Sequence, residues 1–155
     1  MSKDPNGKTE KPADAPRPMQ VETIMTTQVL TVNPTMTVRD AILLLTTNNI
    51  SGAPVVDNKQ TVLSVVSEGD LLKLAASMGM EKQINLCLEK LPKFDDLITA
   101  RSHATFTDIY KLFLGRSVHR IIITDDNGKL RGIVSRSNVL RVLVDRPVDS
   151  TAPKT

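Results

Sequence analysis

The sequence has few of the residues that build disulfides, metal sites or catalytic centres. It contains one cysteine, Cys87, and two histidines, His103 and His119. A single thiol cannot form a disulfide within the chain, which excludes a disulfide-stapled scaffold. The histidines and the cysteine stand far apart without ligand spacing, so we expect no metal site. No Ser-His-Asp grouping and no Gly-x-x-x-x-Gly-Lys phosphate loop occurs, and we therefore expect no catalytic activity.

Long apolar runs and clustered basic residues are also missing. No apolar run approaches the ~20 residues that cross a bilayer, and the N-terminus lacks the apolar segment of a signal peptide. The formal net charge is only +3, without a Lys/Arg cluster interleaved with aromatic residues. We therefore expect a cytoplasmic protein that binds neither membranes nor nucleic acid. Aromatic residues make up 3% of the chain, so the core should be aliphatic.

What the sequence does contain is an internal repeat. An apolar run ending at Asp125, a turn through Asn127-Gly128 and a second run ending at Ser135 predict a hairpin followed by a helix. The same layout occurs earlier, with runs ending at Asp57 and Ser67, and the offset between the two copies is 68 positions throughout. The chain is therefore two copies of one unit.

Each copy reads as β-α-β-β-α. Strands are expected at 29–32 and 97–99, and hairpins at 53–67 and 118–135. Helices are expected after Thr37 and Thr105, each of which opens a capping box with an aspartate three residues on. Further helices are expected at 68–79 and 137–144, with a helical piece in the link that Pro92 ends. A unit this small has too little core to stand alone, so the copies should pack together.

The expected domain organisation follows from this repeat. We predict a disordered tail at 1–20, a first repeat at 21–80, a linker at 81–95, a second repeat at 96–145 and a tail at 146–155. The first segment is rich in Pro, Lys, Asp and Glu and has almost nothing to bury, which is typical of disordered chain.

The repeat resembles the CBS domain (cystathionine-β-synthase domain), which occurs in tandem pairs. The resemblance extends over about 21–144. It rests on Ile24-Met-Thr26 with Thr31-Val32, on residues 50–57 and 65–72 of the first copy, and on 118–125 and 132–140 of the second.

The resemblance implies an α+β module of two repeats packed with pseudo-twofold symmetry and two clefts between them. Many such modules bind adenosine nucleotides (AMP, ADP or ATP) in these clefts as regulatory ligands, and others bind S-adenosylmethionine. Freestanding pairs are commonly regulators that associate as homodimers and act on another protein. No cofactor is required.

Ser67 and Asp70 stand at a strand-to-helix junction. A Ser-x-x-Asp sequence is itself a plausible capping box. In the family this aspartate often binds both ribose hydroxyls, a role that suits an acceptor-only carboxylate. The two roles are compatible, since one turn can be capped by Ser67 while Asp70 faces a cleft.

The second copy departs from this pattern. It has Ser135 but places Asn138 opposite Asp70, and Ile122 opposite Pro54. An amide binds a ribose less strongly than a carboxylate does. We therefore expect one good nucleoside site and one that is weak or empty.

His119 and Arg120 adjoin the start of a strand, where neighbouring side chains point to opposite faces. One interpretation is a partly buried histidine beside a solvated arginine. By the family resemblance, both would bind the phosphate of a nucleotide whose ribose Asp70 holds, and a guanidinium suits phosphate. Arg136, at the start of the last helix, is either a second phosphate ligand or an ordinary surface arginine.

The adenine base needs small or apolar neighbours and backbone groups that read its edge. The candidates are Thr31, Val32, Ser51, Ala53 and Pro54. The alternative for each is an ordinary core or turn residue.

Two functional hypotheses follow. The first is a ligand-sensing regulatory module that binds an adenosine nucleotide, or an S-adenosylmethionine-type ligand, and signals to a partner. The second is a constitutive dimerisation or scaffold module with vestigial clefts. Apolar residues beyond what one helix face needs indicate a helical interface in either case. These residues are Leu43, Leu44, Leu112 and Leu114.

Overall fold

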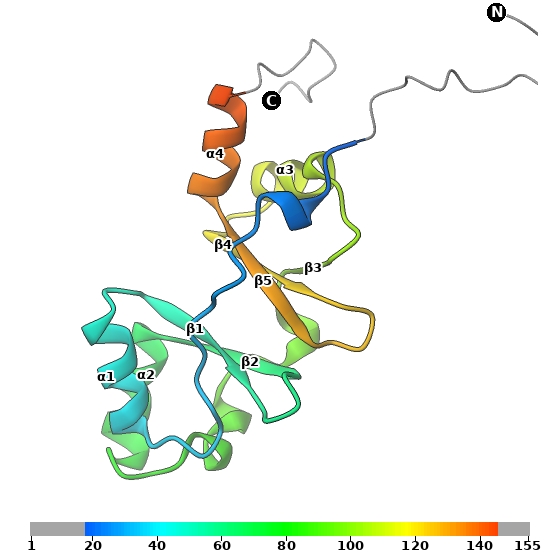
Figure 1. Cartoon of the computed structure of the whole chain (residues 1–155). Helices are drawn as coiled ribbons and strands as arrows, with labels where there is room; N and C mark the ends of the chain where they lie inside the picture. Colours follow the sequence, from blue (N-terminus) through cyan, green and yellow to red (C-terminus); the bar gives the residue numbers. More distant parts are fainter. Residues whose placement is uncertain (1–17, 146–155) are drawn as a thin grey trace, which may run out of the picture.

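The computed structural model describes residues 18–145. Of the tails predicted at 1–20 and 146–155, residues 1–17 and 146–155 lie outside the described residues. The prediction is wrong for the end of the first tail, because the Phe106 N–H donates to Met19 O at 2.7 Å and Gln20 forms a bridge with Thr105. Helices and strands form two similar halves, each with a pair of consecutive strands between two helices (Figure 1). This confirms the α+β prediction. The first half contains α1 (Val38–Thr47), β1 (Gly52–Val56), β2 (Val62–Ser67) and α2 (Glu68–Met78). The second contains β3 (Thr99–Arg101), α3 (Phe106–Gly115), β4 (Arg120–Thr124), β5 (Leu130–Ser135) and α4 (Arg136–Asp145).

Each half is built on an antiparallel hairpin. In β1–β2 Gly52 pairs with Ser67, and in β4–β5 the equivalent Arg120 pairs with Ser135. The turns match as well, because Gln60 (φ 67°) stands where the second hairpin has Gly128 (φ 77°). In the second half β3 runs parallel to β4. The strand expected at 29–32 is reduced to one parallel bridge between Val32 and Val55.

The predicted capping boxes fix where the helices begin. The side chains of Thr37, Ser67 and Thr105 each accept a hydrogen bond from the amide three residues on, and the aspartate there accepts one in return. Before α4 the same geometry forms with an amide, since the Ser135 N–H donates to Asn138 Oδ1 at 2.8 Å. Each hairpin therefore passes into its helix with a satisfied first turn.

The segment that precedes each repeat packs on the core of the other repeat: the linker packs on repeat 1, and the N-terminal lead-in packs on repeat 2. The 3-10 turns η2 (Ile84–Leu86) and η3 (Leu88–Lys90) follow repeat 1. Residues of this stretch pack into the α1–α2 core, where burial also raises the pKa of the Cys87 thiol. The lead-in turn η1 (Val21–Thr23) packs instead on the core of the second half, where the Val21 N–H donates to Ala104 O at 2.9 Å. Figure 1 shows this segment beside α3.

The packing units of the structure therefore differ from the repeat and linker ranges predicted from the sequence. Residues 21–26 extend onto repeat 2, although the sequence groups them with 21–80. Part of the 81–95 linker completes the core of repeat 1. The repeat offset shows which residues correspond but does not show which copy each lead-in covers. The remaining turn, η4 (Phe94–Asp96), leads into β3.

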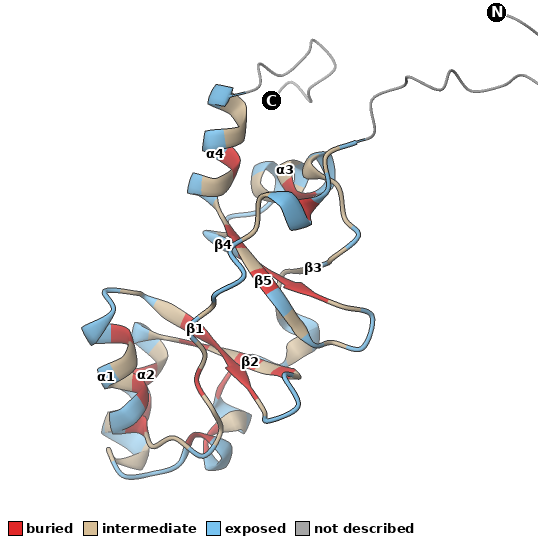
Figure 2. Cartoon of the chain, in the orientation of Figure 1, coloured by how far each residue is buried: buried red, intermediate tan, exposed pale blue. Residues whose placement is uncertain are grey.

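The two hairpins meet turn to turn about the pseudo-twofold axis. The Val62 N–H donates to Gly128 O at 3.1 Å, and the Leu130 N–H donates to Gln60 O at 2.8 Å. These two bonds are equivalent under the 68-residue offset. Beside them, Val56, Val62 and Ile122 form a separate buried cluster. Buried residues lie along both hairpins (Figure 2). The repeats therefore pack together through this cluster, as predicted, and each half also has a buried cluster of its own.

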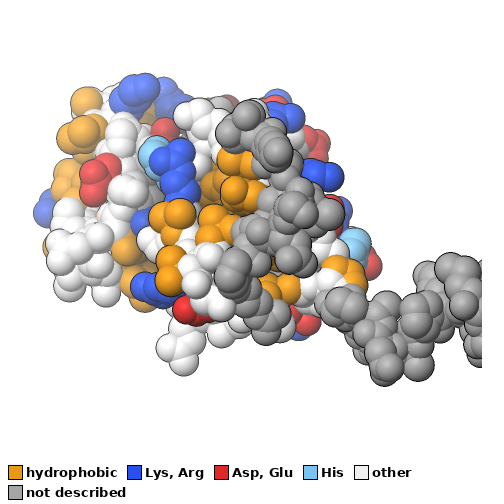
Figure 3. Space-filling model, turned by 90° about the horizontal axis from the view of Figure 1, so that it is seen from above, with side chains coloured by type: hydrophobic (Ala, Val, Ile, Leu, Met, Phe, Trp, Pro, Cys, Tyr) orange, Lys and Arg blue, Asp and Glu red, His pale blue; other side chains and the backbone are white. Residues whose placement is uncertain are grey.

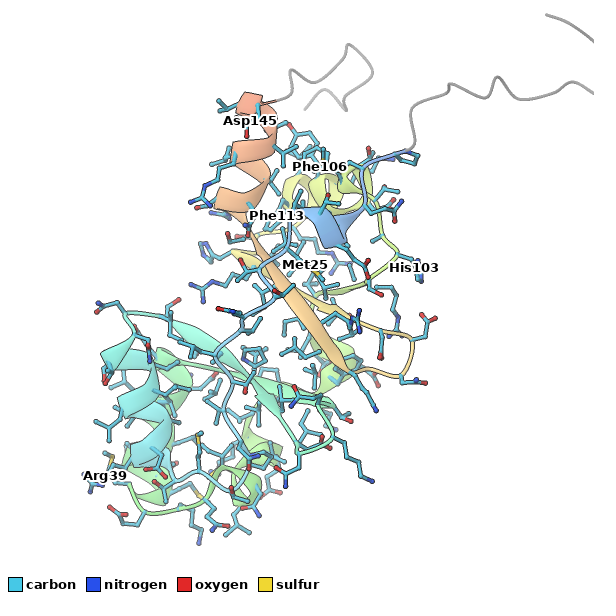
Figure 4. The ribbon with its side chains drawn as sticks, viewed as in Figure 1. Met25, Arg39, His103, Phe106, Phe113 and Asp145 are labelled. Atoms are coloured by element: carbon cyan, nitrogen blue, oxygen red, sulfur yellow. The ribbon has the colours of Figure 1, made fainter. Side chains whose placement is uncertain are left out.

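Gly132 lies where the N-terminal lead-in crosses β5. A Cβ at this position would stand 2.7 Å from Thr26 O and 2.8 Å from Met25 Sδ. Figure 4 shows Met25 alongside β5. Backbone atoms cannot yield as a flexible side chain does, so the lead-in can approach only a glycine.

We expect Gly132→Ala to destabilise the protein by about 1–3 kcal/mol, because the lead-in must move away from β5. Urea unfolding followed by circular dichroism measures this change. Gly115→Ala, where nothing lies within 4 Å of the added carbon, is the matched control and should be close to neutral. Equal stability of the two variants would contradict the close approach.

The caps also predict an acid sensitivity. Hydrogen bonds from the Thr105 backbone and hydroxyl lower the pKa of Asp108. A depressed folded pKa stabilises the fold above the unfolded value of about 3.9 and loses that effect as pH falls through the folded pKa. Asp108→Asn should therefore show a shallower loss of stability below about pH 4 than the wild type does. Urea midpoints measured across this range test it, and parallel pH profiles would contradict it.

Candidate functional site

A cavity of about 390 Å³ lies between the two repeats. Its size falls within the ~300–1,000 Å³ usual for small-molecule sites. Both halves of the chain line it, and they contribute Ser51, Gly52, Ala53, Pro54, Val65, Ser67, Asp70, Pro92, Leu97, Ile98, Val118, His119, Arg120, Ile122 and Ile133. We call it the Asp70 cavity.

On one side of the cavity, the start of α2 presents Asp70. Its Oδ2 accepts hydrogen bonds from the Ser67 N–H and the Ser67 hydroxyl, both at 2.9 Å. This is the predicted capping box. Among residues 18–145, no protein group donates to the other oxygen, Oδ1. One carboxylate thus caps the helix and keeps an acceptor for a ligand.

On the other side, His119 and Arg120 come from repeat 2. Both line the cavity because β4 begins only at Arg120. His119 precedes the strand, so the alternation of strand side chains does not separate the two. The Arg120 Nη1 donates to the Gly52 carbonyl at 3.3 Å, a contact that links the repeats. The remaining guanidinium N–H groups can serve a ligand.

The adenine candidates divide into two groups. Ser51, Ala53 and Pro54 line the Asp70 cavity, but Thr31 and Val32 line neither this cavity nor the second one described below. Val32 is fully buried, and its N–H donates to Pro54 O at 2.9 Å. Thr31 and Val32 were expected to line the base pocket, and the structure places them outside both cavities.

Residues of the other repeat take that place. Leu97 and Ile98, from the lead-in of repeat 2, line the Asp70 cavity together with Val118. They stand at the offset from Val29, Leu30 and Ile50, which line the second cavity. Sequence reasoning missed them because it took each base pocket from the repeat that supplies the aspartate.

The second cavity, of about 270 Å³, is the pseudo-twofold counterpart of the first. We call it the Asn138 cavity. Ser135 and Asn138 of the second copy line it, and Gly52, Pro54, Arg120 and Ile133 line both cavities. Arg136 lines neither. Its Nε donates to Val118 O at 3.1 Å, so this arginine contacts the backbone just before β4.

Neither a metal centre nor a membrane span is found in the part of the chain that the structure describes. Between residues 18 and 145 there is no grouping of three or more His, Cys, Asp or Glu side chains that could hold a metal ion. In the same range no helix is both long enough and apolar enough to cross a bilayer.

Comparison with known sequences points to one family. The sequence model of the CBS domain matches residues 21–77 and 94–145. A chloroplastic CBS domain-containing protein of Arabidopsis thaliana, CBSX2, is 32% identical over 134 residues, which cover 71% of this chain and 56% of CBSX2. A protein of Methanocaldococcus jannaschii is 39% identical over 136 residues, covering 68% of this chain and 80% of its own length. Another relative from that organism, 32% identical, is spanned over only 36% of its length.

Solved structures agree with this assignment. The crystal structure of CBSX2 in complex with AMP superposes with a TM-score of 0.69 at 28% identity, covering 82% of this chain and 97% of that one. Staphylococcus aureus OpuCA has the same fold, with a TM-score of 0.67 at 20% identity over 79% of this chain and 97% of its own.

Proposed function

This chain belongs to the CBS-domain family, and from this premise we propose that it is a regulatory module that binds an adenosine nucleotide in the Asp70 cavity. The observation that carries the proposal is the pairing across the cavity. A carboxylate with a free oxygen comes from repeat 1, and a basic pair comes from repeat 2. A similar module, CBSX2, has been crystallised with AMP.

The chemistry of each side suits one part of a nucleotide. Asp70 Oδ1 is an acceptor for ribose hydroxyls, and a charged acceptor makes stronger hydrogen bonds than a neutral one. Arg120 and His119 present donors to a phosphate. Between them, Pro54, Leu97 and Ile98 form apolar walls for a flat base. S-adenosylmethionine offers Arg120 only one carboxylate and also carries a sulfonium and an ammonium group, so the phosphate of AMP, ADP or ATP is the better fit to this basic pair.

Regulation would follow from the position of the ligand between the repeats. A nucleotide held by Asp70 and Arg120 ties the two halves together, and it favours the conformation in which both contacts form. We propose that a partner protein responds to that conformation or to the homodimer it stabilises. A non-catalytic role and a cytoplasmic location remain predictions.

Exposed apolar side chains favour a second candidate, a constitutive dimerisation module. On α1 and α2, Leu43 is 55% exposed and Leu72 is 74% exposed. Leu140 on α4 is 59% exposed, and Figure 3 shows apolar side chains at the surface of the molecule seen from above. A constitutive scaffold would give a dimer, seen by light scattering, whose stability is indifferent to every nucleotide.

Asp70→Asn separates ligand binding from folding. Asn138 already forms the same cap in repeat 2, so the variant should fold with little loss of stability, while the ribose loses its charged acceptor. We expect AMP at 100 times its dissociation constant to stabilise the wild type by roughly 2.7 kcal/mol, and to stabilise the variant far less.

The measurement is a thermal shift with AMP, ADP and ATP, supported by isothermal titration. Asp108→Asn, which changes a capping box outside both cavities, is the control and should keep the wild-type shift. An equal AMP shift in Asp70→Asn and wild type would contradict the site. No shift with any adenosine nucleotide would favour the scaffold.

Arg120→Gln tests the phosphate side of the cavity. Because the guanidinium would contact phosphate and not the nucleoside, the variant should lose about tenfold in AMP affinity, or ~1.4 kcal/mol. Adenosine affinity should stay nearly unchanged. Isothermal titration of both ligands against both proteins gives the comparison. Equal losses for AMP and adenosine would show that Arg120 acts on the shape of the cavity instead.

A further inference from the structure

The two cavities present opposite hydrogen-bonding groups at equivalent positions. The Ser135 N–H and the Ser135 hydroxyl both lie 2.8 Å from Asn138 Oδ1. A backbone N–H can only donate, so the atom facing it must be the amide oxygen. The amide cannot flip without breaking the cap of α4. The group left for the cavity is therefore the Nδ2 amino group, a donor, where Asp70 offers the acceptor Oδ1.

The charge of the Asn138 cavity is positive, which favours an anionic ligand as the amide donor does. Its lining residues are Thr26, Gln28, Val29, Leu30, Ile50, Gly52, Pro54, Arg120, Ile133, Ser135 and Asn138. Arg120 is the only charged residue among them, and the set contains no carboxylate. Asn138, Gln28 and Thr26 add uncharged polar side chains. A phosphate would therefore meet a cation and an amide donor, with no opposing negative charge in the lining.

A ribose would fit this cavity less well. It would have no carboxylate acceptor for its hydroxyls, and the space of about 270 Å³ is smaller than that of the Asp70 cavity. A small oxyanion accepts hydrogen bonds at every oxygen, which is what Asn138 Nδ2 and Arg120 require. Asparagine in place of aspartate at this position thus changes the ligand that fits, from the diol of a ribose to an anion.

We propose that the Asn138 cavity is an anion site that binds a phosphate group, with Asn138 Nδ2 and Arg120 as its donors. The phosphate is either free inorganic phosphate or the end group of a small phosphate monoester. The proposal does not require a nucleotide in the Asp70 cavity. Arg120 lines both cavities, however, so a phosphate here and the phosphate of a nucleotide in the Asp70 cavity would compete for one guanidinium.

The test is a titration of the full chain with inorganic phosphate, followed in ¹H–¹⁵N spectra at constant ionic strength. We expect saturable shifts of the Asn138 side-chain NH₂ and of the backbone amides around Ser135. Glycerol phosphate replaces inorganic phosphate in a second series. Shifts with inorganic phosphate alone indicate free phosphate as the ligand, and shifts with both probes indicate that a phosphate monoester binds as well. Both results support the site.

Asn138→Asp is the decisive variant. It recreates the capping box that Ser67 and Asp70 form, so it should fold, but it places a carboxylate where the phosphate would bind. We expect phosphate affinity at this site to fall by about tenfold or more. His119→Gln, which changes the Asp70 cavity alone, should leave the shifts at Asn138 intact. If phosphate bound at His119, the phosphate-induced shifts would be lost in His119→Gln instead.

Two outcomes would overturn the proposal. One is the absence of any saturable shift at Ser135 and Asn138 in the wild type. The other is equal phosphate affinity of Asn138→Asp and the wild type. Failure of AMP to perturb the amides near Asp70 would count against the proposed function alone, so the two failures are distinguishable.

Discussion

The two reciprocal hydrogen bonds between the hairpin turns set the rest of the molecule in place. The Val62 N–H bonds Gly128 O, and the Leu130 N–H bonds Gln60 O. They hold the hairpins about one axis, so the helix start of each repeat faces the strand start of the other. Asp70 therefore meets His119 and Arg120 across one cavity. Neither repeat alone supplies both the carboxylate and the basic pair.

The serine-based cap is the element on which both cavities depend. In each repeat it satisfies the first turn of a helix, and the aspartate or asparagine of the cap lines a cavity. The side-chain atom outside the cap is an acceptor in aspartate and a donor in asparagine. One difference between two otherwise equivalent positions can thus give a module two sites of different specificity without altering the fold.

Local signals made much of this predictable from the sequence. The 68-residue offset, the Asn127-Gly128 turn and the capping boxes all depend on neighbouring residues, and the structure contains each of them. Asp70, His119 and Arg120 were placed in one cavity by their resemblance to the family. The exchange of lead-ins was not predictable in this way, because Val21 and Ile84 look equally able to cover either core. Leu97 and Ile98 line the Asp70 cavity in place of Thr31 and Val32, because the base pocket was expected from the repeat that supplies the aspartate and the other repeat provides it.

The most direct test of the account is a crystal structure of the chain with AMP. The account predicts ribose hydroxyls within about 2.6–3.2 Å of Asp70 Oδ1, the base against Leu97 and Ile98, and the phosphate at His119 and Arg120. AMP bound elsewhere, or held by one repeat without the other, would contradict it.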